Sequence, residues 1–245
     1  MSGGFSVPDF PCRPGTPRRS ARTLELMALI YQAELTPSKI DLIEHWVRTQ
    51  PWFAGSDTAE LSNVAAYRFD DPDGEVGIET LLVQAGNGPV LQVPLTYRAA
   101  PLKDADSWLI GTMEHSVLGR RYVYDAVGDP VYLTAVATAV LTGGRDSDQY
   151  VSTDGELVRR NSTARVLGSG ATDTPVPSIS AATAVAVRHE NGRTIVHADS
   201  LHFVLVRTAN PMSPPQSDDV TGAAGLTGTW TGQPDAVTLG WVLAP

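Results

Sequence analysis

The chain has 245 residues, enough for one large domain or two small ones with a sizeable core. Its net charge of −9 at pH 7 and its pI near 4.9 argue against a nucleic-acid-binding protein, because no basic stripe is present to neutralise phosphates. Cys12 is the only cysteine, which excludes intramolecular disulfides and cysteine metal sites, and no apolar run reaches the roughly 18–20 residues of a membrane span. The N-terminus also lacks the apolar centre of a secretory signal, so we expect a cytoplasmic protein.

Three elements are predicted in the first part of the chain. Residues 1–23 are rich in Pro, Gly, Ser and Arg and are expected to be a disordered tail. The apolar run 27–31 predicts a strand. Thr36-Pro37 then predicts the cap and first residue of a helix, which stops near Pro51.

An antiparallel meander is predicted next. The sequence Asp70-Asp71-Pro72-Asp73-Gly74 is typical of a turn between two strands of a hairpin, and it is only a weak candidate for a cation site. Pro94 suggests an edge strand or a bulge. The predicted strands are 63–69, 76–84, 90–98, 108–117 and 120–125. After them, Asp129-Pro130 predicts the start of a helix that runs to Leu141 and, being apolar almost all round, is buried against the sheet.

The last part of the chain is predicted to be rich in loops and hairpins. Residues 144–182 are rich in Gly, Ser, Thr, Asp and Pro and predict a flexible loop or insertion, with one short strand at 164–167. Asn191-Gly192 favours a type I′ turn between a strand at 184–189 and one long strand at 194–207. A closing hairpin is predicted from 226–231 and 237–243.

The run His197-Ala198-Asp199-Ser200-Leu201-His202 is similar to the H-G-D-L-H catalytic loop of small-molecule kinases of the aminoglycoside-phosphotransferase type. Within one strand, however, alternation places His197 and His202 on opposite faces, so that they cannot share a site. The downstream Asn or Gln and second Asp of such kinases are also missing. We therefore interpret the run as part of a strand. The sequence contains no phosphate-binding loop, no nucleophile elbow and no zinc-protease motif.

Several motifs in order carry a family resemblance. They are PWFAG (51–55), AAYRFDDPDGEVGIETLLV (65–83), VPLTYR (93–98) and GTMEHSVLGRRYVYDAVGDPVY (111–132). Residues 27–143 resemble the N-terminal cap region of bacterial maltokinases, and more closely the stand-alone cap-like proteins of high-GC bacteria that are often labelled 1,4-alpha-glucan branching proteins. The resemblance implies that Met27 is the usual start, residues 1–26 being an extension or an upstream start.

The resemblance also implies an α+β fold, in which a curved antiparallel sheet packs on helices as a cystatin-like cap with an additional C-terminal β-hairpin region. We expect a cap-like domain at 24–143 and a β-rich region at 183–245 that packs on it. The strand of the kinases that carries a phosphate-anchoring Lys corresponds here to 201–207, which offers only Arg207. We therefore expect a non-catalytic interaction or regulatory module linked to maltose, trehalose or α-glucan metabolism.

Two other functions stay open. A saccharide-binding protein would use aromatic platforms, for which the candidates are Trp52, Trp108, Tyr122, Tyr124 and Trp230. A glucan-active enzyme would need two carboxylates, from among Glu75, Glu79, Glu114 and Asp125. No catalytic residue, metal or cofactor is predicted, and no nucleic-acid or membrane partner.

A binding surface is predicted where polar and aromatic residues gather on neighbouring strands. Its members are Arg98, Glu114, His115, Arg120, Arg121, Tyr124 and Asp125. The alternative is an ordinary solvated sheet face.

Overall fold

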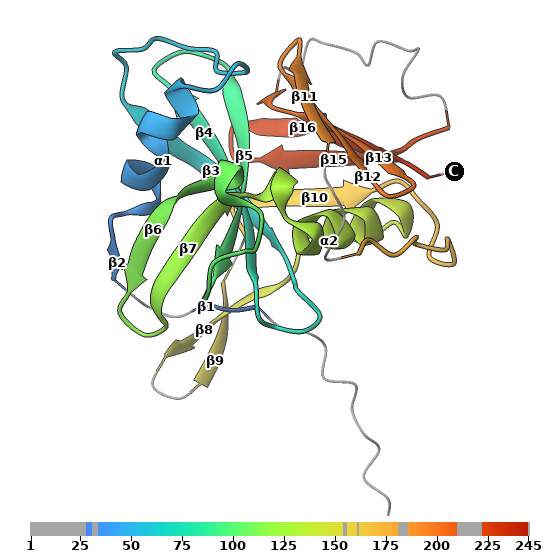
Figure 1. Ribbon diagram of the computed structural model, residues 1–245, viewed down its shortest axis with the longest axis horizontal. Helices are drawn as coiled ribbons and strands as arrows, with labels where there is room; N and C mark the ends of the chain where they lie inside the picture. The colour runs from blue at the N-terminus through green and yellow to red at the C-terminus, as the bar shows by residue number, and fades with distance from the viewer. Residues whose placement is uncertain are drawn as a thin grey trace, which may run out of the picture.

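The structure, a computed structural model, describes residues 28–30, 34–153, 156–160, 162–180, 186–209 and 222–244. In this part of the chain two antiparallel sheets lie beside each other with two α-helices and a small third sheet (Figure 1). The first sheet consists of β2 (Leu35–Thr36), β3 (Leu61–Phe69), β4 (Gly77–Ala85), β5 (Val90–Arg98), β6 (Leu109–His115), β7 (Gly119–Asp125) and β14 (Thr208–Ala209). The second sheet consists of β10 (Ala164–Gly168), β11 (Ala186–Glu190), β12 (Arg193–Ala198), β13 (Leu201–Val206), β15 (Ala224–Trp230) and β16 (Gln233–Leu243). No helix among the described residues is long and apolar enough to cross a membrane.

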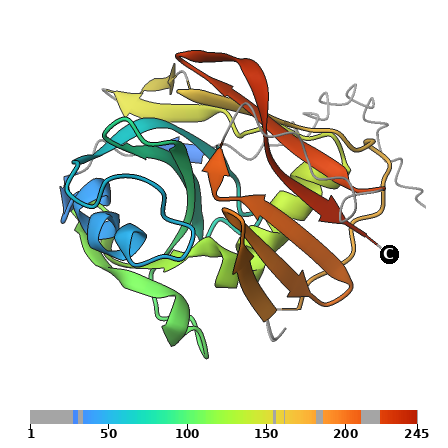
Figure 2. The same cartoon turned by 90° about the horizontal axis from the view of Figure 1, so that it is seen from above.

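The first sheet curls around helix α1 (Lys39–Arg48), as Figure 2 shows. Its strand order is β2-β6-β7-β5-β4-β3. The predicted meander is confirmed for β3, β4 and β5, and β5 has the predicted bounds, but β5 pairs next with β7 and not with β6. Ile43 and Val47 of α1 lie in a core with the apolar face of the sheet. The acidic turn at 70–74 connects two paired strands, β3 and β4, as predicted. The buried Asp71 carboxylate stabilises it by accepting hydrogen bonds from the backbone N–H groups of Asp73, Glu75 and Val76.

The start of α1 differs from the prediction. Thr36 belongs to β2 and pairs with Glu114 of β6, so it is not the helix cap. Ser38 is the cap instead: its side-chain oxygen accepts from the backbone N–H of Asp41 at 3.2 Å. Long-range strand pairing thus engages the residue that the local pattern assigns to the helix.

Pro94 also lies differently from the prediction. β5 is paired with β4 along one side, so it is not an edge strand, and no bulge separates the two. On its other side β14 pairs with Val90 and Leu91, whereas β7 pairs with residues 95–98. Pro94 lies in the interval between these two partners, where a missing backbone N–H leaves no ladder bond unmade.

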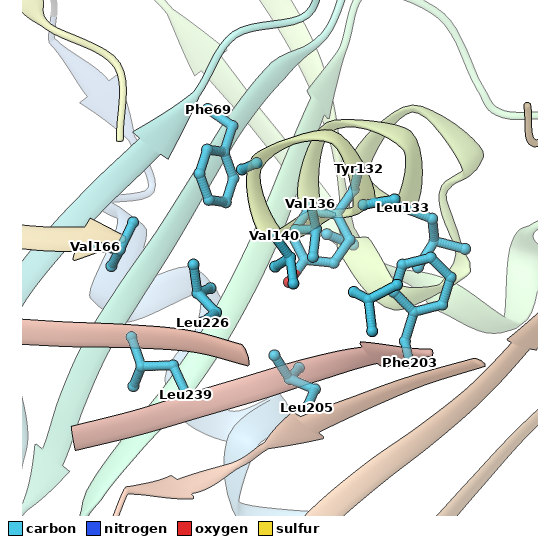
Figure 3. Packing of buried hydrophobic residues seen from close by; sticks show 14 of the residues in the cluster. Phe69, Tyr132, Leu133, Val136, Val140, Val166, Phe203, Leu205, Leu226 and Leu239 are labelled. Atoms are coloured by element: carbon cyan, nitrogen blue, oxygen red, sulfur yellow. The ribbon is translucent and has the colours of Figure 1, made fainter. Parts of the chain in front are cut away.

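Helix α2 (Pro130–Leu141) lies between the two sheets. As predicted, the Asp129 side chain caps it and Pro130 occupies its first turn. The two short 3-10 turns η1 (Asp106–Trp108) and η2 (Ala126–Gly128) precede it. Figure 3 shows the side chains that surround α2: Phe69 of β3, Val166 of β10, Phe203 and Leu205 of β13, Leu226 of β15 and Leu239 of β16. The helix is therefore buried on nearly all sides, which explains its apolar sequence.

The stretch 144–182 holds more strands than predicted. The expected strand at 164–167 is present as β10, and a hairpin of β8 (Gln149–Thr153) and β9 (Glu156–Arg160) precedes it. β1 (Ala28–Ile30), within the strand predicted at 27–31, pairs in parallel with β8. The predicted disordered tail at 1–23 lies outside the described residues.

In the second sheet both predicted hairpins are present, but the predicted long strand at 194–207 is broken. The Asn191-Gly192 turn joins β11 and β12 with positive φ at both residues, as type I′ requires. A second turn at Asp199-Ser200, with φ of +52° at Asp199, then separates β12 from β13. The interpretation of HADSLH as part of one strand is wrong: it is a hairpin, and His197 pairs directly with His202.

Candidate interaction site and the joint between the sheets

Four of the predicted surface residues lie near the turn of the hairpin of β6 and β7, which projects from the body of the molecule (Figure 1). Glu114 and Arg120 are exposed and form an ion pair, with 2.7 Å between Arg120 Nε and Glu114 Oε1. This pair lies across the two strands, since the two residues are register partners. It gives the hairpin a defined arrangement of opposite charges at its surface.

His115 and Arg121 hold the turn of this hairpin in shape. His115 Nδ1 accepts from the backbone N–H groups of Val117 at 3.2 Å and Leu118 at 3.1 Å. Burial and the nearby charge of Arg121 lower the pKa of His115, which favours the neutral ring that can accept these bonds. Arg121 Nη2 donates to the carbonyl of Leu118 at 2.7 Å.

The tip of the hairpin is apolar and exposed. Val117 is 54% exposed and Leu118 is 44% exposed. Leu109 is also exposed, but it lies at the other end of β6, away from the turn. Val117 and Leu118 are two of the five large apolar side chains that are exposed among the described residues. An exposed apolar cluster bordered by charges is typical of a protein-binding site. The hairpin tip, defined as Val117 and Leu118 with the pair Glu114–Arg120, is the candidate interaction site.

The other three predicted residues point into the molecule and do not share this surface. Arg98 forms a two-bond ion pair with Asp129, Nε to Oδ2 and Nη2 to Oδ1, both at 2.7 Å. Tyr124 is buried, and its hydroxyl accepts from the backbone N–H of Leu102 at 2.8 Å. Asp125 is also buried and takes part in the joint described next.

A buried ion pair joins the two sheets. The fully buried guanidinium of Arg207 donates through Nη2 to both oxygens of Asp125 on β7, at 2.9 and 2.6 Å. Its Nε donates to Thr194 Oγ1 on β12 at 2.8 Å, and its Cζ lies 4.6 Å from the centroid of the Trp52 ring. In the sequence, Arg207 stands where the kinases have a phosphate-anchoring Lys. Here its charge is engaged by Asp125, which gives it a structural role.

Gln92 of β5 makes a second link that sequence analysis missed. Tyr67 donates its hydroxyl proton to Gln92 Oε1 at 2.7 Å. Gln92 Nε2 donates to the carbonyls of Val206 and Leu239 in the second sheet, at 2.8 and 2.9 Å. The signal in the sequence is a single amide within the otherwise apolar start of β5, VLQVPL. A fully buried amide needs polar partners, so it points to a tertiary contact.

The aromatic residues proposed for saccharide binding are mostly packed inside the protein. Trp52 and Tyr124 are buried in the core, Trp108 and Trp230 pack against the core around α2, and Tyr122 is half-buried. Together they form no shared platform, because they belong to different parts of the packing.

The carboxylates proposed for glycosyl chemistry are likewise engaged or apart. Glu79 is buried beside Lys39 and Arg68 and accepts from the hydroxyl of Tyr97 at 3.0 Å. Burial alone would raise the pKa of Glu79, but the two cations and the hydrogen bonds lower it to about 2. Glu79 therefore stays deprotonated at neutral pH and cannot serve as a general acid. Asp125 is held by Arg207, Glu114 lies on the exposed hairpin, and Glu75 is exposed beside the acidic turn.

Comparison with known proteins identifies part of the chain. Residues 46–129 match the maltokinase N-terminal cap domain, which confirms the resemblance for this segment. The matched segment runs from the end of α1 through β3–β7 to the cap of α2, and so includes the hairpin tip and Asp125. No curated protein matches the chain.

Proposed function

We propose that this maltokinase-cap-like module is a non-catalytic protein that binds a partner protein of maltose, trehalose or α-glucan metabolism through the hairpin tip. The observation that carries the proposal is the pair of adjacent exposed apolar side chains at residues 117 and 118, within the segment that matches the cap domain. Apolar side chains at the centre and charged residues at the rim are the usual anatomy of a protein interface.

The hairpin tip is held in shape before any partner arrives. His115 accepts two backbone hydrogen bonds in the turn, and Arg121 binds its carbonyl. Binding through such a turn loses less conformational entropy than ordering a flexible loop. The charges of Glu114 and Arg120 would then select the orientation of the partner.

The match to the cap domain supports the link to maltose, trehalose or α-glucan metabolism. We also propose a cytoplasmic location and a cystatin-like packing of the first sheet on α1. Saccharide binding has less support, because the aromatic candidates are packed into the interior or against it. Glucan hydrolysis or transfer also has less support, because Glu79 and Asp125 are held in buried ion pairs.

The test is a pull-down from the native host with the tagged full chain and the double variant Val117→Ser/Leu118→Ser. We expect a maltose, trehalose or glucan enzyme to co-purify with the unchanged chain and to be lost with the double variant. The matched control is Val158→Ser, since Val158 on β9 is 52% exposed but lies outside the hairpin tip. All three proteins should unfold within about 0.5 kcal/mol of one another. If no such enzyme co-purifies above background, or if the double variant retains it, the proposal is wrong.

A further inference from the structure

The hairpin of β12 and β13 brings two histidines together. His197 and His202 are register partners, and their ring centroids lie 4.2 Å apart with 69° between the ring planes. These are two of the five histidines in the chain. Their pairing follows from the Asp199-Ser200 turn, because residues that flank a two-residue turn at equal distances face each other across the hairpin.

The position of the pair favours convergence of the two rings. Ala198 and Leu201 flank the turn and form its hydrogen-bonded pair. In an antiparallel hairpin the next pair is not hydrogen-bonded, and pairs of this kind hold their side chains closest together. His197 and His202 therefore project from the same face with their side chains adjacent, so that small ring rotations can direct one nitrogen of each toward a common point.

The two rings are accessible and suited to bind a cation. His202 is exposed and His197 is half-buried. Arg188 of β11 contributes a positive charge near His197. The charge of Arg188 opposes a cation, but Glu190 lies 3.5 Å from its Nη2 and offsets part of that charge.

We propose that His197 and His202 form a two-histidine site for a first-row transition-metal ion, with water at its remaining positions. Imidazole nitrogen suits Cu²⁺, Ni²⁺ and Zn²⁺, whereas Mg²⁺ and Ca²⁺ prefer oxygen ligands. Among the described residues no set of three His, Cys, Asp or Glu side chains gathers to hold a metal, so the affinity rests on the two rings. The order of affinities then follows the intrinsic series, with Cu²⁺ bound most tightly. A bound ion would also connect β12 to β13 beside the turn.

The test is calorimetry of the full chain, with any affinity tag removed, against Cu²⁺, Ni²⁺, Zn²⁺ and Mg²⁺. We expect one equivalent of Cu²⁺ to bind most tightly and Mg²⁺ to give no heat. His197→Ala and His202→Ala should each remove this binding. The matched control is His45→Ala, which removes an exposed histidine of α1 and should leave binding unchanged.

Two further measurements keep the test decisive. Thermal unfolding without metal shows whether each variant is folded, and Cu²⁺ should raise the melting temperature of the unchanged chain and of His45→Ala only. The electron paramagnetic resonance spectrum of the bound Cu²⁺ should show two coordinated imidazole nitrogens. The proposal is overturned if the folded chain binds none of the three ions, or if both His197→Ala and His202→Ala retain the high-affinity equivalent.

Discussion

The two sheets of this protein share a pattern of hairpins and differ in the strands that are added to it. In each sheet three consecutive strands pair in chain order, β3-β4-β5 in the first and β11-β12-β13 in the second. The last of the three pairs with the second strand of a further hairpin, β7 in the first sheet and β16 in the second. In the second sheet the order is β10-β15-β16-β13-β12-β11, so β10 pairs with a strand that begins some sixty residues later, at Ala224. The hairpins of both sheets thus close over short turns. The remaining strands, β10 in the second sheet and β2 and β14 in the first, are added by long-range pairing, which costs more chain entropy to form.

The two halves of the molecule, each built around one of the two sheets, nevertheless share one core. The cluster around α2 contains Tyr67 and Leu82 of the first sheet as well as Phe203 and Leu239 of the second. The segment that matches the cap domain therefore has one face covered by α1 and the other covered by parts of the chain outside the match. This arrangement leads us to expect a single cooperative unfolding transition.

The largest expected effect comes from breaking the ion pair that joins the halves. Arg207→Met keeps most of the side-chain volume next to Trp52 but leaves Asp125 as an uncompensated buried charge. We expect the free energy of unfolding to fall by about 3–5 kcal/mol, measured by urea denaturation. The double variant Arg207→Met/Asp125→Leu should lose less, because it buries no charge. A loss below about 1 kcal/mol in the single variant would show that the pair is not a joint.

An intermediate and pH-dependent effect is expected from Glu79, which acts only within the first half. Its pKa in the folded protein is about 2, below the ordinary value of 4.5, so its stabilisation is present above pH 4.5. It is lost as the pH falls from 4.5 toward 2, because protonation then favours the unfolded chain. The contribution is at most roughly 3 kcal/mol at neutral pH.

Urea denaturation of the unchanged chain and of Glu79→Gln at pH 7, 4.5 and 2.5 tests this assignment. The variant should be less stable at pH 7, and the difference between the two proteins should shrink across the acidic window. Parallel losses in both proteins would assign the acid sensitivity to other groups.

The smallest of the three effects is expected at Gln92, where only neutral hydrogen bonds connect the halves. Gln92→Met leaves the carbonyls of Val206 and Leu239 and the hydroxyl of Tyr67 without this partner. We expect a loss of about 2 kcal/mol in the free energy of unfolding, with faster amide exchange in β13 and β16. The matched control is Gln84→Met, which removes one hydrogen bond to Gly88 within a single turn and should leave the second sheet unaffected.

Much of the first sheet could be predicted because its turns are marked locally. The acidic turn at 70–74 and the break before Gly119, whose φ is +70°, delimit strands whose bounds agree closely with the structure. The cap of α2 was equally clear from Asp129-Pro130. The local sequence does not predict the structure where a distant strand decides it. Thr36 pairs with β6, so Ser38 caps α1 instead.

The candidate site could be predicted only in part. Glu114 and Arg120 were expected at a surface and are exposed, but their neighbours in sequence, Tyr124 and Asp125, are buried. The contact of Asp125 with Arg207, 82 residues later, leaves no trace in local periodicity. The hairpin of His197 and His202 was missed because Asp-Ser is a weaker turn signal than Asn-Gly, although Asp tolerates positive φ.

Gln92 also bears on how the two halves can change in evolution. Its amide reaches backbone carbonyls in the second sheet, and every amino acid carries such a carbonyl. The residues at 206 and 239 can therefore be exchanged without removing the acceptors, provided that the strands keep their course. The requirement for a particular side chain falls on one partner only, so the cap-like half can keep its attachment while the sequence facing it diverges.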